Sequence, residues 1–154
     1  MPLKRESAPL PSSVQSSFRK VAAAANALNA ASDRFSGLVG EIDTLLKPLN
    51  IGISCWVTVS EWSTENDRGE EQVGYDKIKG NWCIGLRNIS EFSEQCDEWA
   101  FSEGPRRMRL KAVDHLTELL DELAKKTEEG TARITDKTSY LEDLVSGLKL
   151  EATK

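Results

Sequence analysis

Apolar residues recur at alternating spacings of four and three through the first third of the chain. A repeat of 3.5 residues is typical of a helix that packs along its length against other helices. The pattern predicts a helix over 12–47, which begins at the capping residue Ser12 and ends before Pro48. The positions of this stripe are Val14, Phe18, Val21, Ala25, Leu28, Ser32, Phe35, Val39, Ile42 and Leu46.

The middle of the predicted helix, 21–31, is rich in alanine. Alanine buries little area, so the stripe would make a weak contact between only two helices, and we expect a bundle of several. The stripe is also too long for a small sheet to cover. We therefore expect self-association, as a homodimer, through the interface residues Val14, Phe18, Val21, Leu28 and Phe35.

The apolar period changes to two after residue 50, which predicts strands. The expected strands lie at 51–60, 72–79 and 82–89. The sheet has three strands, or four if 98–102 forms a short further strand. The connection over 61–71 is acidic and is expected to be a solvated loop. Lys79, Gly80 and Asn81 predict a tight hairpin turn, so the simplest sheet over 51–102 is an antiparallel meander.

Helical spacing returns after Gly104 and Pro105 and predicts a helical region over 105–149. Residues 128–131 are a weak point, so one bent helix and two helices both fit. We expect the first and last helices to pack antiparallel in a bundle. The predicted class is α+β: a disordered arm over 1–11 followed by a single domain over 12–150.

Composition narrows the function classes. The net charge of −5 disfavours nucleic acid as a general partner, although a local basic patch could override it. No apolar run approaches the roughly 20 residues that span a bilayer, so no membrane partner is expected. Three cysteines without a C-x-x-C pair, and a single histidine, predict reduced thiols in a cytoplasmic protein without a metal or cofactor.

A basic cluster at the start of the last helical region is the strongest local feature. Arg106, Arg107, Arg109 and Lys111 crowd a helix N-terminus, where the dipole disfavours positive charge and free N–H groups favour an anion. These side chains could bind a phosphate or carboxylate, as in nucleic acid or a phosphorylated partner. We favour internal pairing with the carboxylates of 91–103, just upstream in the chain, over this anion-binding interpretation.

Four tryptophans lie in or beside the strand segment: Trp56, Trp62, Trp82 and Trp99. Aromatic side chains on a sheet can stack on bases, but more often they fill the contact between a sheet and a helix. The negative charge favours the second interpretation, and Trp62, at the edge of the polar loop, is the candidate for an exposed contact.

Catalytic motifs are missing from the sequence: there is no G-x-S-x-G, P-loop or dinucleotide-binding pattern. An enzyme would have to assemble carboxylates and arginines through the fold. The leading hypothesis is a non-enzymatic protein-interaction or structural protein, in which the partner is a second copy or another protein. The alternative is an anion-binding module that uses the basic cluster.

Overall fold

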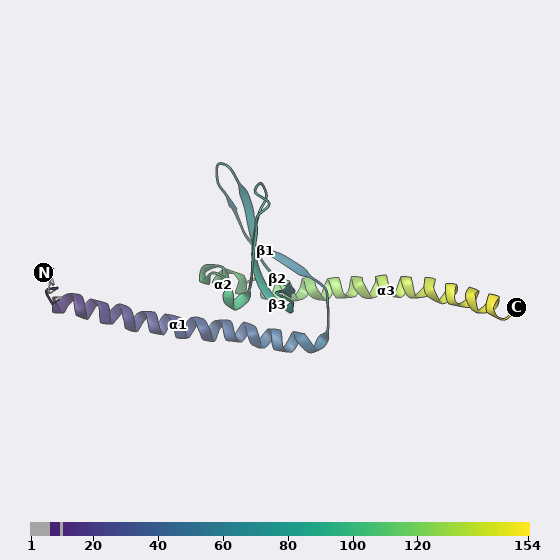
Figure 1. Ribbon diagram of the computed structural model, residues 1–154, viewed down its shortest axis with the longest axis horizontal. Coiled ribbons are helices and arrows are strands. Elements are labelled where there is room, and N and C mark those ends of the chain that lie inside the picture. Colours follow the sequence, from purple (N-terminus) through teal and green to yellow (C-terminus); the bar gives the residue numbers. More distant parts are fainter. Residues whose placement is uncertain (1–6, 10) are drawn as a thin grey trace, which may run out of the picture.

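The computed structural model describes residues 7–9 and 11–154, and most of the predicted disordered arm over 1–11 lies outside these residues. Long helices flank an antiparallel sheet, so the predicted α+β class is confirmed (Figure 1). The elements in chain order are α1 Ser12–Leu46, the short 3-10 helix η1 Lys47–Leu49, β1 Cys55–Ser63, β2 Arg68–Ile78, β3 Asn81–Ser90, β4 Cys96–Ala100, the short 3-10 helix η2 Phe101–Glu103, α2 Arg106–Val113 and α3 Leu116–Ala152.

The helix α1 is unbroken over 35 residues, as the apolar stripe predicts. At 1.5 Å per residue it is about 50 Å long. Pro11 is the cap residue, and its carbonyl accepts the N–H of Val14, so the predicted cap at Ser12 is wrong by one position. Pro48 has no N–H to continue the helix, and the chain leaves η1 through Asn50, whose φ of 48° is left-handed.

The sheet is an antiparallel meander in the order β1-β2-β3-β4, which confirms the predicted topology and the fourth strand. The strand β1 begins at Cys55 rather than Ile51, after a left-handed turn at Gly52 (φ 62°). The strand β2 begins at Arg68, well before the predicted position 72, because its first residues pair with both β1 and β3. The acidic connection was therefore wrongly predicted to be all loop.

The predicted turn between β2 and β3 is confirmed at Lys79 and Gly80. Both residues have left-handed φ values, 49° and 85°, and Ile78 pairs with Asn81 across the turn. Two successive left-handed residues give the type of hairpin turn whose twist matches the strands, and glycine adopts one of them without steric cost.

The core lies on one face of the sheet. Val57, Val73 and Leu86 are neighbours across three strands and are almost fully buried. The described helices all cover this face: α1 packs on β3, α2 on β2 and β3, and α3 on β1 and β2. The core side chains that the helices and η2 contribute are Val39, Phe101, Met108, Ala112, Leu119 and Leu123.

The tryptophans divide between the two faces of the sheet. Trp82 and Trp99 pack against the core, as expected of a sheet–helix contact. Trp56 lies on the other face, over Gly74, where an added Cβ would come within 2.3 Å of its ring. The guanidinium of Arg87 stacks on Trp56 at 4.1 Å from the ring centroid, so this ring shields backbone and a cation rather than a helix.

The last helical region breaks at Asp114 and His115, so it is two helices, and the predicted weak point at 128–131 is wrong. The turn lets Met108 of α2 and Leu119 of α3 both reach the core. Gly130 stays inside α3, and Cδ1 of Ile53 lies 3.2 Å from the place of a Cβ there. This glycine therefore gives room to the segment that leads into β1.

The two long helices diverge from the sheet. The first half of α1 and the second half of α3 project beyond the sheet on opposite sides, while both helices run the same way across the view (Figure 1). Their contacts are also separate, because α1 packs on β3 and η2 and α3 packs on β1 and β2. The predicted antiparallel bundle within one chain is not confirmed.

Candidate functional site

The projecting half of α1, residues 12–28, is called the α1 arm. Its stripe residues Val14, Phe18, Val21 and Leu28 are all exposed, Phe18 by 71%. The same face of the helix continues into Val39, which is buried against the sheet. The apolar face is thus continuous, but the sheet covers only its second half.

The projecting half of α3, residues 131–152, is called the α3 arm and has the same organisation. Leu119 and Leu123, near the start of the helix, are buried against the sheet. The face that they occupy continues into the arm, where the side chains are exposed, Ile134 by 70%. The exposed apolar side chains of this face are Ile134, Leu141, Leu144, Val145 and Leu148.

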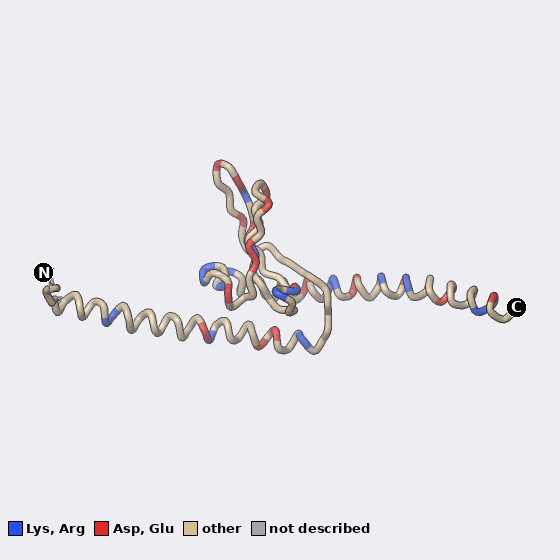
Figure 2. The backbone as a smooth tube through the Cα atoms, viewed as in Figure 1, with Lys and Arg blue, Asp and Glu red and all other residues tan. Residues whose placement is uncertain are grey.

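Charge is unevenly distributed over the molecule (Figure 2). Arg19 and Lys20 are the charged residues of the α1 arm, and at 100° per residue they lie away from the stripe. On the face of α3 that carries the arm's stripe, Lys137 is the one charged position. Each arm is therefore amphipathic, with an apolar face that meets solvent.

Two residues of the predicted interface lie elsewhere. Phe35 packs inside the molecule, with its ring centroid 6.1 Å from that of Phe101. Trp62 lies on the β1–β2 hairpin, where its ring covers Gly69 and its Nε1 donates to Asn88 Oδ1 at 2.7 Å. The four remaining predicted residues, Val14, Phe18, Val21 and Leu28, share the exposed face of the α1 arm.

The basic cluster at the start of α2 is engaged with α1. Arg106 donates to Asn29 Oδ1 at 3.0 Å, and Arg109 donates to Ser36 Oγ at 2.6 Å. These acceptors are neutral, and Lys111 is exposed. The arginines thus fix α2 against α1. They are engaged within the chain, as the favoured interpretation expects, but their partners on α1 are Asn29 and Ser36 rather than the carboxylates of 91–103.

The fourth member of the cluster, Arg107, pairs with Glu71 on β2, at 2.6 Å between Nη2 and Oε1. Glu71 is 5% exposed and also accepts a hydrogen bond from Ser60. Burial alone would raise the pKa of Glu71, but Arg107, Ser60 and the charge of Lys111 hold it below its usual range. This pair connects α2 to β2 at Glu71, which lies opposite Ser60 of β1.

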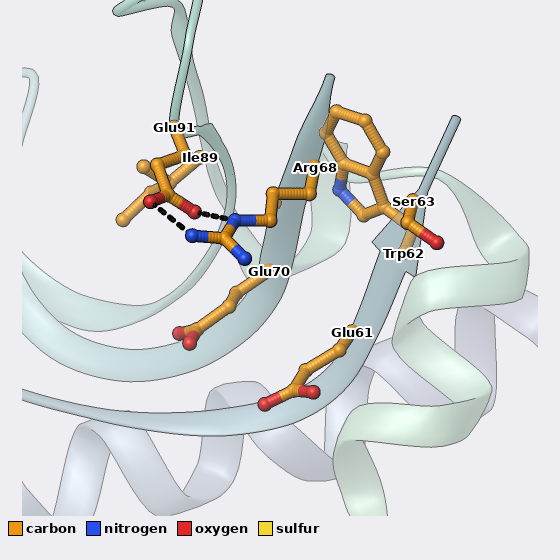
Figure 3. Close-up of a pocket in the computed structure, with 8 residues that line it drawn as sticks. Glu61, Trp62, Ser63, Arg68, Glu70, Ile89 and Glu91 are labelled. Atoms are coloured by element: carbon orange, nitrogen blue, oxygen red, sulfur yellow. Dashed lines mark hydrogen bonds and ion pairs between the residues drawn. The ribbon is translucent and has the colours of Figure 1, made fainter. Parts of the chain in front are cut away.

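The β1–β2 hairpin, with Ile89 and Glu91, lines a hollow of about 690 Å³. Figure 3 shows its side chains. The guanidinium of Arg68 points toward Glu91, while the carboxylates of Glu61 and Glu70 lie below Arg68 in this view. Glu61 and Glu70 are direct neighbours across the strands. The lining offers carboxylates, one paired guanidinium and the Trp62 ring, but no histidine or thiol.

The tip of the hairpin is held by Asp67. Its carboxylate accepts hydrogen bonds from Ser90, Ser93 and the backbone N–H of Phe92, and so ties the β1–β2 loop to the β3–β4 loop. The hydrogen bond from Ser90 is the main reason why the pKa of Asp67 lies below its usual range. No local pattern predicts this contact, because its partners are distant along the chain.

The three cysteines differ in access, and none is in a disulfide. Cys55 is buried, Cys83 is half-buried and Cys96 is exposed. Burial, followed by the charge of Asp43, raises the pKa of Cys83 to about 11. Cys96 is therefore the thiol that a reagent in solution reaches first.

A small apolar groove of about 130 Å³ lies where the α1 arm meets α2. Its lining comprises Leu28, Ala31, Phe35 and Leu110 together with Ser32, Arg106 and Arg109. No helix in the described part of the chain has a segment long and apolar enough to cross a membrane. Comparison with models of known protein families, with functionally characterised proteins and with solved structures gave no match to this chain.

Proposed function

We propose that this chain is a non-enzymatic interaction protein that associates with itself through its two helical arms. The observation that carries the proposal is the uncovered apolar face of each arm, which continues the face that packs on the sheet. Contiguous apolar patches on a soluble chain mark sites where another surface binds. The reduced thiols expected from the sequence favour a cytoplasmic location.

The helical bundle that the sequence predicts would then form between chains. Most of the stability of a helix in water comes from tertiary packing of its apolar face. An arm of this length with no partner would leave that contribution unused over half of each helix. Association would therefore bury the apolar faces of the arms, as the small sheet buries the apolar faces of the other halves of α1 and α3.

Charged substitutions on the two faces of the α1 arm test the proposal. In Val21→Asp a carboxylate replaces a stripe residue, and burying it without a partner is costly. In the control, Ala23→Asp, the same charge lies on the opposite face of the same turn. Light scattering after size exclusion should give a reduced mass for Val21→Asp and an unchanged mass for Ala23→Asp; equal masses for both variants and the unmodified chain contradict the proposal.

Anion binding is a second candidate, favoured by one observation. Arg106 and Arg109 donate to neutral oxygens, so no described carboxylate neutralises them at these contacts. A fluorescently labelled single strand and a duplex, titrated at low salt, test this candidate. It requires binding that weakens with salt and with Arg106→Ala; no binding of either nucleic acid removes its nucleic-acid form.

A further inference from the structure

We infer that the arms pair reciprocally: the α1 arm of one copy lies antiparallel on the α3 arm of the second copy, and the same contact repeats on the other side. The inference rests on the proposed self-association and specifies its geometry. The occupant of each uncovered face is thus the other arm of an identical chain.

The directions of the helices set this geometry. The two arms project on opposite sides of the sheet, and both helices run the same way across the view (Figure 1). In the proposed dimer a two-fold axis places the α1 arm of one copy beside the α3 arm of the other, and the rotation reverses the direction of one helix, so the paired arms are antiparallel. The two contacts are then identical, as closed two-fold symmetry requires.

The spacing of the stripes fits this pairing. Both stripes alternate steps of four and three, so an antiparallel register brings every layer into contact at once. The layers pair Val14 with Leu148 of the partner, Phe18 with Leu144 of the partner, Val21 with Leu141 of the partner, Ala25 with Lys137 of the partner and Leu28 with Ile134 of the partner.

One layer of this register explains the lysine in the α3 stripe. Lys137 faces Ala25, whose small side chain leaves room for the methylene stem while the ammonium group reaches solvent. A parallel pairing of two α3 arms would instead place Lys137 against the same lysine of the partner. Like charges in a packed layer disfavour that arrangement.

The area also favours two contacts over one. The side chains in question are 44–71% exposed and have on the order of 100 Å² of apolar surface each, so the nine in one arm pair bury about 500 Å². A specific interface needs about 1,000 Å² or more. Two arm pairs reach about this value, before the alanines and the methylene stems are counted. The nine are Val14, Phe18, Val21, Leu28, Ile134, Leu141, Leu144, Val145 and Leu148.

The groove at the base of the α1 arm lies where the register ends. Leu28 lines it, and the partner's Ile134 is the side chain that the register places against Leu28. Although Ser32, Arg106 and Arg109 contribute to the lining, the surface exposed in the groove is almost wholly apolar. The groove can therefore receive the branched side chain that begins the α3 arm.

Disulfide trapping between two differently tagged chains tests the pairing. Both chains carry Cys96→Ser; a tagged chain adds Ala25→Cys and an untagged chain adds Lys137→Cys. They are mixed with reductant, checked for dimer mass by sedimentation, and then oxidised. The control replaces Ala25→Cys by Ala23→Cys, on the opposite face of the same helix.

Reciprocal pairing predicts a tagged–untagged disulfide at least about tenfold above the control, because a disulfide needs Cβ atoms about 4 Å apart. Dimers that give only tagged–tagged and untagged–untagged disulfides, or as much product with the control, overturn the reciprocal pairing and leave self-association standing. A monomeric mass for the unmodified chain and both variants overturns the proposed function and the pairing together.

Discussion

The ion pair between Arg107 and Glu71 predicts unequal losses of stability when its two partners are removed one at a time. Arg107→Ala removes the half of the pair that is mostly exposed, and leaves a carboxylate that is almost fully buried. Glu71→Gln removes the buried charge and leaves an arginine that water can solvate. Although both changes break the same contact, the first should therefore be the more destabilising.

The expected magnitudes follow from burial. Breaking a fully buried pair by removing one partner costs about 3–5 kcal/mol, and the exposure of Arg107 reduces this to about 2 kcal/mol for Arg107→Ala. Glu71→Gln keeps the shape of the side chain and should cost about 1 kcal/mol. The double variant should resemble Glu71→Gln, since the unpaired buried charge is absent from both. Lys111→Ala, an exposed change on the same helix, should stay within about 0.5 kcal/mol.

The pH dependence separates these cases further. In the unmodified chain the pKa of Glu71 is lowered, so the pair stabilises the fold at neutral pH and this contribution is lost as the pH falls through that pKa. Without Arg107, burial dominates and the pKa of Glu71 rises. Arg107→Ala should therefore become more stable, relative to the double variant, as the pH falls from 7 toward 5.

Urea unfolding followed by tryptophan fluorescence measures these differences. All proteins are compared at one concentration, because association contributes to apparent stability. Equal losses for Arg107→Ala and Glu71→Gln at both pH 7 and pH 5 would show that Glu71 is not buried as a charge and would refute the reasoning.

Three further outcomes are expected. Asp43 Oδ1 accepts the N–H of Ile84 at 2.7 Å, so Asp43→Ala should cost about 1–3 kcal/mol in urea unfolding. Asp43→Asn retains an acceptor and should cost less; equal losses argue against the bond. Gly69→Ala should lower the thermal midpoint, because its Cβ would lie 2.0 Å from a backbone oxygen, and an unchanged midpoint contradicts this contact. Mass spectrometry after brief alkylation at pH 8 should find Cys96 modified before Cys83; the reverse order contradicts their difference in access.

The features that the sequence predicts correctly are local. The length of α1 follows from one long stripe, in which Ser32 is the polar position, and from Pro48, and the hairpin turn follows from Gly80. In each case the residues that decide the structure are neighbours along the chain. For the same reason, the apolar face of the α1 arm can be recognised in the sequence from the spacing of its stripe.

The features that it misses depend on distant partners. Glu71 lies in a segment that looks like a loop in the sequence, and Arg107, 36 positions away, pairs with its buried carboxylate in the strand. No glycine or proline marks the break between α2 and α3 at His115. Its position depends on the packing of both helices on the sheet, which the local sequence does not show. Gly130 resembles a helix breaker, but it accommodates Ile53.

Sedimentation equilibrium of the unmodified chain at micromolar concentrations tests the central claim most directly. Association through the arms predicts an average mass that rises with concentration from the chain mass of 17.1 kDa toward twice that value. A mass that stays at 17.1 kDa across this range would contradict self-association through the α1 and α3 arms.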